Sequence, residues 1–264
     1  VVSFVNVTVY GNSPYGALDT RDVKLLTANS NKQMKSFGVV DESDYNAFTY
    51  MSPTVRSSAQ SSLNPYKGLG HYSTKFDGIN DYYQVAHDTY DNDLGYWTED
   101  WTLEFFFKIG DLKADAMDWC GKSGGAGNQP KWILGMNMST GFGYEANILH
   151  LYNWTASGHT WHRTTVNWVS GKWYHLAVVY QYSNNQTTVY LDGSQVIQTT
   201  GDTFASNAGA LTVGTDTESF KDFSGLISNF RISKGIQRYT STFDVPTSPL
   251  TNDIYTIMLT SYGN

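Results

Sequence analysis

The stretch that decides the fold is Trp-Thr-Leu-Glu-Phe-Phe-Phe-Lys-Ile at residues 101–109. Successive side chains of a β-strand point to opposite faces, so the residues of this stretch divide into two sets. The first set is entirely apolar and contains Trp101, Leu103, Phe105, Phe107 and Ile109. The second set is mixed and contains Thr102, Glu104, Phe106 and Lys108. The alternation predicts a strand whose first face lies in a hydrophobic core.

A second apolar stretch, residues 173–182 (WYHLAVVYQY), is apolar on both faces, as expected of a central strand. Asn184-Asn185 follows it and predicts a hairpin into residues 187–191. We expect His175 to be packed and hydrogen-bonded rather than catalytic, because a general base also needs positioned partners. Arg231 is expected to form a structural ion pair with an acidic residue.

The rest of the chain shows the same organisation of short strands separated by turns. Turns recur every 8 to 12 residues or so, which is the spacing of a β-sandwich rather than of βαβ units. Residues 1–10 (VVSFVNVTVY) read as one more strand, and residues 112–119 are the best short helical stretch. The chain is therefore predicted to be all-β.

Composition excludes several classes of protein. Of 264 residues, 40% are hydrophobic and 15% aromatic, which excludes a disordered chain. The net charge of −7 would repel nucleic acid, so no nucleic-acid partner is expected. The single cysteine, Cys120, excludes an internal disulfide. No apolar run approaches the roughly 20 residues of a membrane helix, so we expect no membrane insertion.

Four segments resemble successive strands of laminin-G-like domains, which belong to the concanavalin A-like lectin/glucanase superfamily. They are residues 173–178, 189–193, 211–214 and 223–232. In the first half, Phe76-Asp77-Gly78 with Asp81-Tyr82, and residues 101–108, are similar to the family's opening strands. The resemblance implies a concanavalin A-like jelly-roll sandwich of two antiparallel sheets.

Residues 23–27 and 231–240 are similar to a subtype found in aquatic bacteriophage virion proteins and bacterial surface proteins. We therefore expect a laminin-G-like domain at residues 22–264. Residues 1–21 fall outside the resemblance and are expected to form an arm or extra strand, paired within the chain or with a neighbour.

No catalytic residue is predicted. A glucanase on this frame needs paired carboxylates on one strand face. Glu42-Ser43-Asp44 lacks a third carboxylate, and the adjacent Glu99 and Asp100 would point to opposite faces. The only close histidine pair, His159 and His162, would also be split between two faces and supplies too few zinc ligands.

Calcium binding stays open at this stage. Many members of the superfamily carry calcium, often with an acidic residue in the last core strand, where this chain has Ser228-Asn229. The candidate oxygen ligands are Asp77, Asp81, Asp222 and Asn229. The favoured alternative is that these side chains cap turns.

A glycan ligand would need aromatic faces for stacking and polar side chains for its hydroxyls. Residues 118–168 are the richest source of both. Trp132 and Trp168 have apolar neighbours and are assigned to packing. The ligand candidates are Trp119, Asn153, Trp154, Trp161 and His162.

The resemblance and the composition together predict a non-enzymatic virion structural protein, a capsid decoration, fibre or tail-associated protein that serves attachment. Attachment would proceed through weak glycan recognition or through assembly contacts. The protein would lie on the virion surface or be extracellular, with other virion proteins or its own copies as partners, and with surface glycans as ligands in the first of these two cases. The alternatives are an extracellular bacterial carbohydrate-binding module, a glycoside hydrolase, and a purely architectural virion protein.

Overall fold

The computed structural model describes residues 48–51, 60–61, 64–66, 73–87, 89, 92–110, 116–123, 131–137, 147–155, 157–216 and 221–260. The expected N-terminal arm at residues 1–21, and the first part of the domain expected to begin at residue 22, lie outside the described residues. So does part of the stretch at residues 112–119.

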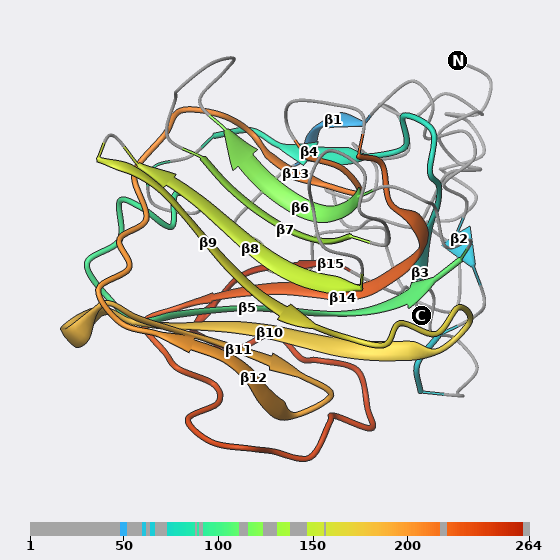
Figure 1. The fold of residues 1–264 in the computed structure, drawn as a ribbon. Helices are drawn as coiled ribbons and strands as arrows, with labels where there is room; N and C mark the ends of the chain where they lie inside the picture. Colours follow the sequence, from blue (N-terminus) through green and yellow to red (C-terminus); the bar gives the residue numbers. More distant parts are fainter. Residues whose placement is uncertain are drawn as a thin grey trace, which may run out of the picture.

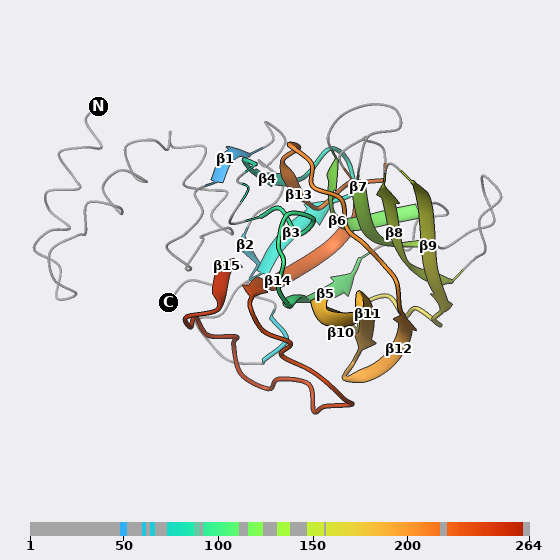
Figure 2. The ribbon, with the colours of Figure 1, turned by 90° about the vertical axis from the view of Figure 1, so that its left-hand side faces the viewer.

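Two antiparallel sheets make up the described part of the chain (Figures 1 and 2). The seven-stranded sheet has the order β1 (Phe48–Met51), β4 (Tyr83–Val85), β13 (Leu211–Val213), β6 (Ala116–Ser123), β7 (Lys131–Asn137), β8 (Ile148–Thr155) and β9 (Gly158–Thr165). The eight-stranded sheet has the order β12 (Ser194–Thr199), β11 (Gln186–Leu191), β10 (Trp173–Gln181), β5 (Trp101–Ile109), β14 (Ser224–Lys234), β3 (Ser73–Asp77) and β2 (Gln60–Ser61), with β15 (Thr256–Thr260) paired to β14. The predicted two-sheet sandwich is confirmed.

The core lies between the two sheets, and β5 is central to it. The five residues of its apolar face all belong to the main hydrophobic cluster, as predicted. The rings of Phe105 and Phe230, from the neighbouring strand β14, stack at 5.5 Å. Across the sandwich, the ring centres of Phe107 and of Trp119 in β6 lie 4.5 Å apart. This aromatic layer joins the two sheets, and burying each ring contributes about 2–3 kcal/mol.

The helical expectation for residues 112–119 is wrong where the structure describes that stretch. Residues 116–123 form β6, which pairs with β7 on one side and β13 on the other. All eight of its residues are buried. Pairing on both edges and burial on both faces outweigh a weak local helix preference.

The predicted turns are present. The 3₁₀ turn η3 (Tyr182–Asn184) links β10 to β11, and Asn185 takes the left-handed conformation that closes it, with φ of 50°. Gly225 has φ of 153°, and a Cβ there would lie 2.1 Å from the Lys108 carbonyl oxygen. The missing side chain at Gly225 therefore lets the backbone of β5 approach β14 closely.

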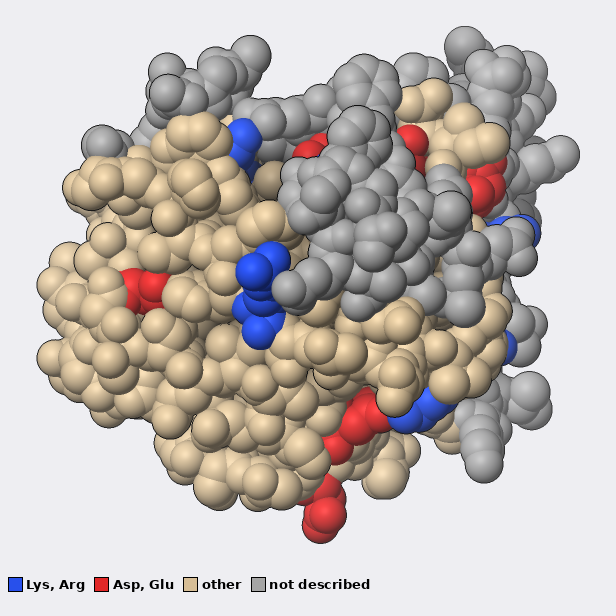
Figure 3. Space-filling model, in the orientation of Figure 1, with Lys and Arg blue, Asp and Glu red and all other residues tan. Residues whose placement is uncertain are grey.

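Residues 235–255 form a strap that runs along the outer face of the eight-stranded sheet, at the bottom of Figure 1. Tyr239 and Phe243 of the strap stack at 3.6 Å and pack on Tyr190 of β11. The strap thereby covers the part of this outer face that β10 and β11 form. On the side of the molecule seen in Figure 3, charged side chains are few within a mostly uncharged surface. This agrees with the 16% of charged residues.

Within the described residues, no helix has the length and apolar character needed to cross a membrane.

Candidate functional site

A pocket of about 210 Å³ lies on the outer face of the seven-stranded sheet. Most of its walls come from β7, β8 and β9. It is lined by Lys131, Ile133, Asn137, His150, Tyr152, Trp161, Asp216 and Lys221.

Strand alternation explains why these side chains face outward. In β7, Trp132, Leu134 and Met136 belong to the core between the sheets. The odd-numbered residues of the strand therefore point away from the core. In β8, Leu149 and Leu151 face the core, so His150 and Tyr152 face the pocket. The apolar packing of one face thus determines what the other face displays.

Three neighbouring strands place Asp118, Gly135 and His150 in one row. Asp118 pairs in register with Gly135, and Gly135 pairs with His150. A Cβ on Gly135 would lie 2.0 Å from Asp118 Oδ1, so only glycine leaves space for that carboxylate. His150 Nε2 lies 3.2 Å from Asp118 Oδ1. The missing side chain at Gly135 therefore opens a slot in which the carboxylate and the imidazole meet.

This row is buried and poor in hydrogen bonds. The side chains of Asp118 and His150 are 0% and 5% exposed. Their contact has the distance of an ion pair but not hydrogen-bond geometry, and neither Asp118 oxygen has a hydrogen-bond partner within the described chain. His150 Nδ1 and Asn137 Oδ1 are likewise buried without a hydrogen-bond partner. Buried acceptors without donors are costly, so they mark a place where a ligand can donate.

Aromatic rings stand beside this polar row. The Tyr152 and Trp161 rings lie 6.3 Å apart in an edge-on arrangement, and Tyr152 also packs on Trp154 at 6.0 Å. His159 stacks on Tyr152 at 5.8 Å. Trp154 and Trp161 are half-buried, so part of each ring faces outward. The face therefore combines apolar ring surface with polar acceptors.

The structure brings together two of the five predicted ligand residues, Trp154 and Trp161. His162 pairs in register with Leu151, a core residue, and therefore lies on the other side of the sheet, where Nε2 is 2.8 Å from Asp202 Oδ1. Asn153 is buried on that same side and donates from Nδ2 to the carbonyl oxygen of Thr203.

The prediction that Trp119 contacts a ligand is wrong. Its ring is 0% exposed and packs against Phe105 and Trp168 in the core. It cannot reach a ligand, because the alternation of β6 directs it between the sheets. The assignment of Trp132 and Trp168 to packing is confirmed.

Sequence reasoning missed Asp118, Gly135, Asn137 and His150. The alternation of residues 131–137 could have indicated that Asn137 points away from the core, since Trp132 was already assigned to packing. The meeting of Asp118 with His150 depends on the register of three strands, and no local signal in the sequence specifies it.

Three of the candidate calcium ligands accept hydrogen bonds from backbone N–H groups in turns. Asp81 Oδ2 accepts a hydrogen bond from the backbone N–H of Asp77 at 2.8 Å, and Asp222 Oδ2 accepts one from Asn80 at 2.7 Å. Asp77 Oδ1 accepts from the backbone N–H of Ile79. These bonds fit the turn-capping alternative.

Asn229 lies further along β14 and accepts hydrogen bonds from the Tyr66 hydroxyl and the Leu250 N–H. In the described part of the chain, no group of three or more His, Cys, Asp or Glu side chains is arranged to hold a metal ion. The structure therefore offers a structural role for each of the four candidates.

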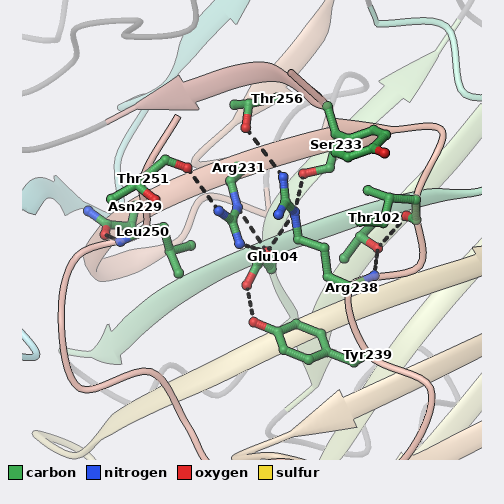
Figure 4. Close-up of polar contacts among 12 residues, drawn as sticks. Thr102, Glu104, Asn229, Arg231, Ser233, Arg238, Tyr239, Leu250, Thr251 and Thr256 are labelled. Atoms are coloured by element: carbon green, nitrogen blue, oxygen red, sulfur yellow. Dashed lines mark hydrogen bonds and ion pairs between the residues drawn. The ribbon is translucent and has the colours of Figure 1, made fainter. Parts of the chain in front are cut away.

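A second polar cluster surrounds Glu104 on the outer face of the eight-stranded sheet, beneath the strap (Figure 4). Arg231 donates to Glu104 Oε1 from Nη2 at 2.6 Å and from Nε at 3.0 Å. Tyr239 donates its hydroxyl to Oε2 at 2.7 Å, and His175 Nε2 lies 3.3 Å from the same oxygen. Within the strap, the Arg238 guanidinium donates two hydrogen bonds to the Asp253 carboxylate.

Burial alone would raise the pKa of Glu104. The hydrogen bond from His175, the charges of Arg231 and His175 and the hydrogen bond from Tyr239 outweigh it and lower the pKa to about 2. Burial and the Glu104 charge raise the pKa of Tyr239. The Glu104 side chain is 0% exposed and bound by protein groups on both oxygens, so this cluster fastens the strap. The structural roles predicted for His175 and Arg231 are confirmed.

The described fold is a two-layer, all-β sandwich with a pocket on one outer face. Residues 77–236 match the family described as the concanavalin A-like lectin/glucanases superfamily, of laminin G type. Because this match spans more than half of the chain, the protein belongs to that superfamily. No curated protein sequence matches the chain.

Three solved structures share the fold. Domain 4 of an extracellular arabinanase from Geobacillus stearothermophilus, in complex with arabinotriose, is 18% identical with a TM-score of 0.50, and the match covers 67% of this chain and 75% of that one. Tailspike protein 2 of an Escherichia coli O157:H7 bacteriophage is 12% identical with a TM-score of 0.52, and the match covers 73% of this chain but 26% of the tailspike. The enzymatically active domain of that tailspike is also 12% identical, with a TM-score of 0.51 and coverage of 75% and 30%. At these identities the likeness establishes the fold alone.

Proposed function

We propose that the outer face of the seven-stranded sheet binds a glycan, and that the protein is a non-enzymatic attachment protein of a virion, in a capsid decoration, a fibre or the tail. The observation that carries the glycan proposal is the 210 Å³ pocket, in which buried acceptors without hydrogen-bond partners lie beside Tyr152 and Trp161. A sugar ring offers both an apolar C–H face and hydroxyl donors, so it complements both features.

The acceptors favour hydroxyl donors for a chemical reason. Asn137 Oδ1 is an acceptor, and His150 Nδ1 is a second buried polar atom without a hydrogen-bond partner in the described chain. A sugar hydroxyl can donate to the first and can either donate to or accept from the second.

The attachment role rests on a different kind of support. Two of the solved structures that share the fold come from a phage tailspike. A pocket of this size holds about one sugar ring, which predicts weak binding at each site. Many copies on a particle would convert weak sites into strong attachment. The protein would then act outside the cell or on the virion surface, with its own copies or other virion proteins as partners.

The test is a glycan array with the purified chain, run once with calcium and once with a chelator. Trp161→Ala should abolish binding, whereas Tyr182→Ala should not, because Tyr182 is an exposed ring in the β10–β11 turn, away from the pocket. Equal thermal unfolding of both variants would show that the loss is local. Absence of binding in both conditions would refute the glycan proposal and leave a purely architectural role.

An assay for released reducing ends on the bound glycans tests the non-enzymatic part. We expect no turnover. Turnover that disappears in Asp118→Asn would instead favour the glycoside hydrolase alternative.

A further inference from the structure

We propose that Asp118, Asn137 and His150 bind a divalent transition-metal ion of the zinc type. The ligand atoms would be a carboxylate oxygen of Asp118, Oδ1 of Asn137 and Nε2 of His150. This inference goes beyond the proposed glycan binding and does not depend on it. It is carried by the distance between Asp118 and His150, and by the buried polar atoms around that contact.

The contact between Asp118 and His150 has the spacing of two ligands on one metal ion. His150 Nε2 lies 3.2 Å from Asp118 Oδ1, without the geometry of a hydrogen bond. Zinc holds imidazole nitrogens and carboxylate oxygens at about 2.0–2.2 Å, so two such atoms at neighbouring corners of a tetrahedron lie about 3.3 Å apart. His162 and Asp202 differ, because a hydrogen bond of 2.8 Å joins them.

Burial gives these atoms a need for a partner. Both Asp118 oxygens and Asn137 Oδ1 are buried without a hydrogen-bond partner in the described chain. The side chains of Asp118 and His150 are 0% and 5% exposed, and Asn137 is 3% exposed. A buried carboxylate is costly unless a cation or a hydrogen-bond donor compensates it. A metal ion bound by all three side chains would supply that compensation.

Neighbouring strands of one sheet hold the three ligands. Asp118 lies in β6, Asn137 in β7 and His150 in β8, which are adjacent (Figure 1). Asn137 stands two positions after Gly135, so it shares the face on which Asp118 and His150 meet. The register of β6 shifts directly after Asp118, and such a bulge redirects side chains. The ligands therefore stand on paired strands, which lowers the cost of ordering them around an ion.

The donor set selects the kind of ion. Imidazole nitrogen suits zinc and its neighbours in the first transition row, whereas calcium prefers about six to eight oxygen ligands. The described chain has no group of three His, Cys, Asp or Glu side chains, so the Asn137 amide has to supply the third ligand. His150 and Asn137 line the pocket, so an ion could enter through it and keep a fourth position open to water or a sugar hydroxyl.

The charges around the pocket limit the affinity. Lys131 and Lys221 also line it, and Asp216 is the acidic residue of the lining. The two lysine charges repel a further cation, and Asp118 is the single anionic ligand. We therefore expect weaker binding than that of a closed zinc site with four charged or imidazole ligands.

The test is isothermal titration calorimetry of the full chain with Zn²⁺ alone, after removal of metal with a chelator. We expect one zinc ion per chain. His150→Gln and Asp118→Asn each remove a ligand and should weaken this binding about 100-fold or more, since loss of a group that merely orients a ligand already costs about 10- to 100-fold. Zinc should also raise the unfolding temperature of the wild type but not of either variant.

The matched control is His162→Gln. His162 lies in the adjacent strand β9 and also contacts an aspartate, but through a hydrogen bond. The control should keep the affinity of the wild type for zinc. Asp118→Asn keeps the shape of the side chain, so it still provides the comparison if His150→Gln does not fold.

No zinc binding by the wild type, or equal zinc binding by the wild type and Asp118→Asn, would overturn this inference. Neither result would affect the glycan-binding function, which the array tests separately. Zinc binding that is lost in Asp118→Asn, together with an array on which no glycan binds, would support the metal site and refute the glycan proposal.

Discussion

Glu104→Gln is the substitution whose effect the structure predicts most fully. Glutamine keeps the shape of the side chain but removes the charge that faces Arg231. The folded-state pKa of about 2, against the ordinary value of 4.5, corresponds to about 3 kcal/mol of stability at neutral pH. Removing one partner of a buried ion pair costs about 3–5 kcal/mol in other proteins, which agrees.

The same reasoning predicts how this loss depends on pH. Folding lowers the pKa of Glu104, so its stabilisation is complete above the unfolded value of 4.5 and is lost as the pH falls toward about 2. At pH 3 the unfolded chain binds this proton and the folded chain mostly does not. By then about 2 kcal/mol of the stabilisation should be gone.

Urea unfolding of the wild type and Glu104→Gln at pH 7 and at pH 3 measures this directly. The difference in unfolding free energy should be about 3–4 kcal/mol at pH 7 and about 2 kcal/mol smaller at pH 3. Glu99→Gln is the control, because Glu99 is 48% exposed and lies 3.6 Å from Lys234. It should change stability by at most about 1 kcal/mol. A Glu104→Gln difference that stays the same at both pH values would refute the assigned role of the Glu104 charge.

Three further substitutions or reactions test other parts of the structure. Gly135→Ala places a Cβ 2.0 Å from Asp118 Oδ1, so it should displace the Asp118–His150 pair and abolish glycan binding, as seen on the array. Trp119→Ala should destabilise the fold by about 3–5 kcal/mol in urea unfolding, because the ring is fully buried in the core. Burial and the nearby Asp118 charge raise the pKa of Cys120, so iodoacetamide should label this thiol only after unfolding. Rapid labelling of the folded protein would contradict that burial.

The fold could be predicted from local pattern, with one error. The alternation of residues 101–109 predicted which side chains of β5 enter the core, and the apolar faces of residues 173–182 predicted a strand covered on both sides. The helical prediction for the stretch around Trp119 was wrong because the local helix preference is weak. This stretch becomes a strand by pairing with β7 and β13.

The candidate site was predictable only in part. Trp154 and Trp161 stood out as aromatic residues beside polar turns, and both lie on the pocket face. His162 stood out for the same reason but faces the other way, toward Asp202. Trp161 and His162 are adjacent in β9, so their side chains point to opposite faces of the sheet. The sequence around them does not specify which of the two faces carries the pocket.

The sequence by itself determined that this chain forms a sandwich, because the period of two in its apolar residues is a local property of each strand. Only the tertiary structure decided that Asp118, Gly135 and His150 meet. Their encounter depends on the register between three strands, and that register is established by core packing and interstrand hydrogen bonds. The same register places Asn137 on the face where Asp118 and His150 meet, and so brings together the three ligands of the proposed metal site.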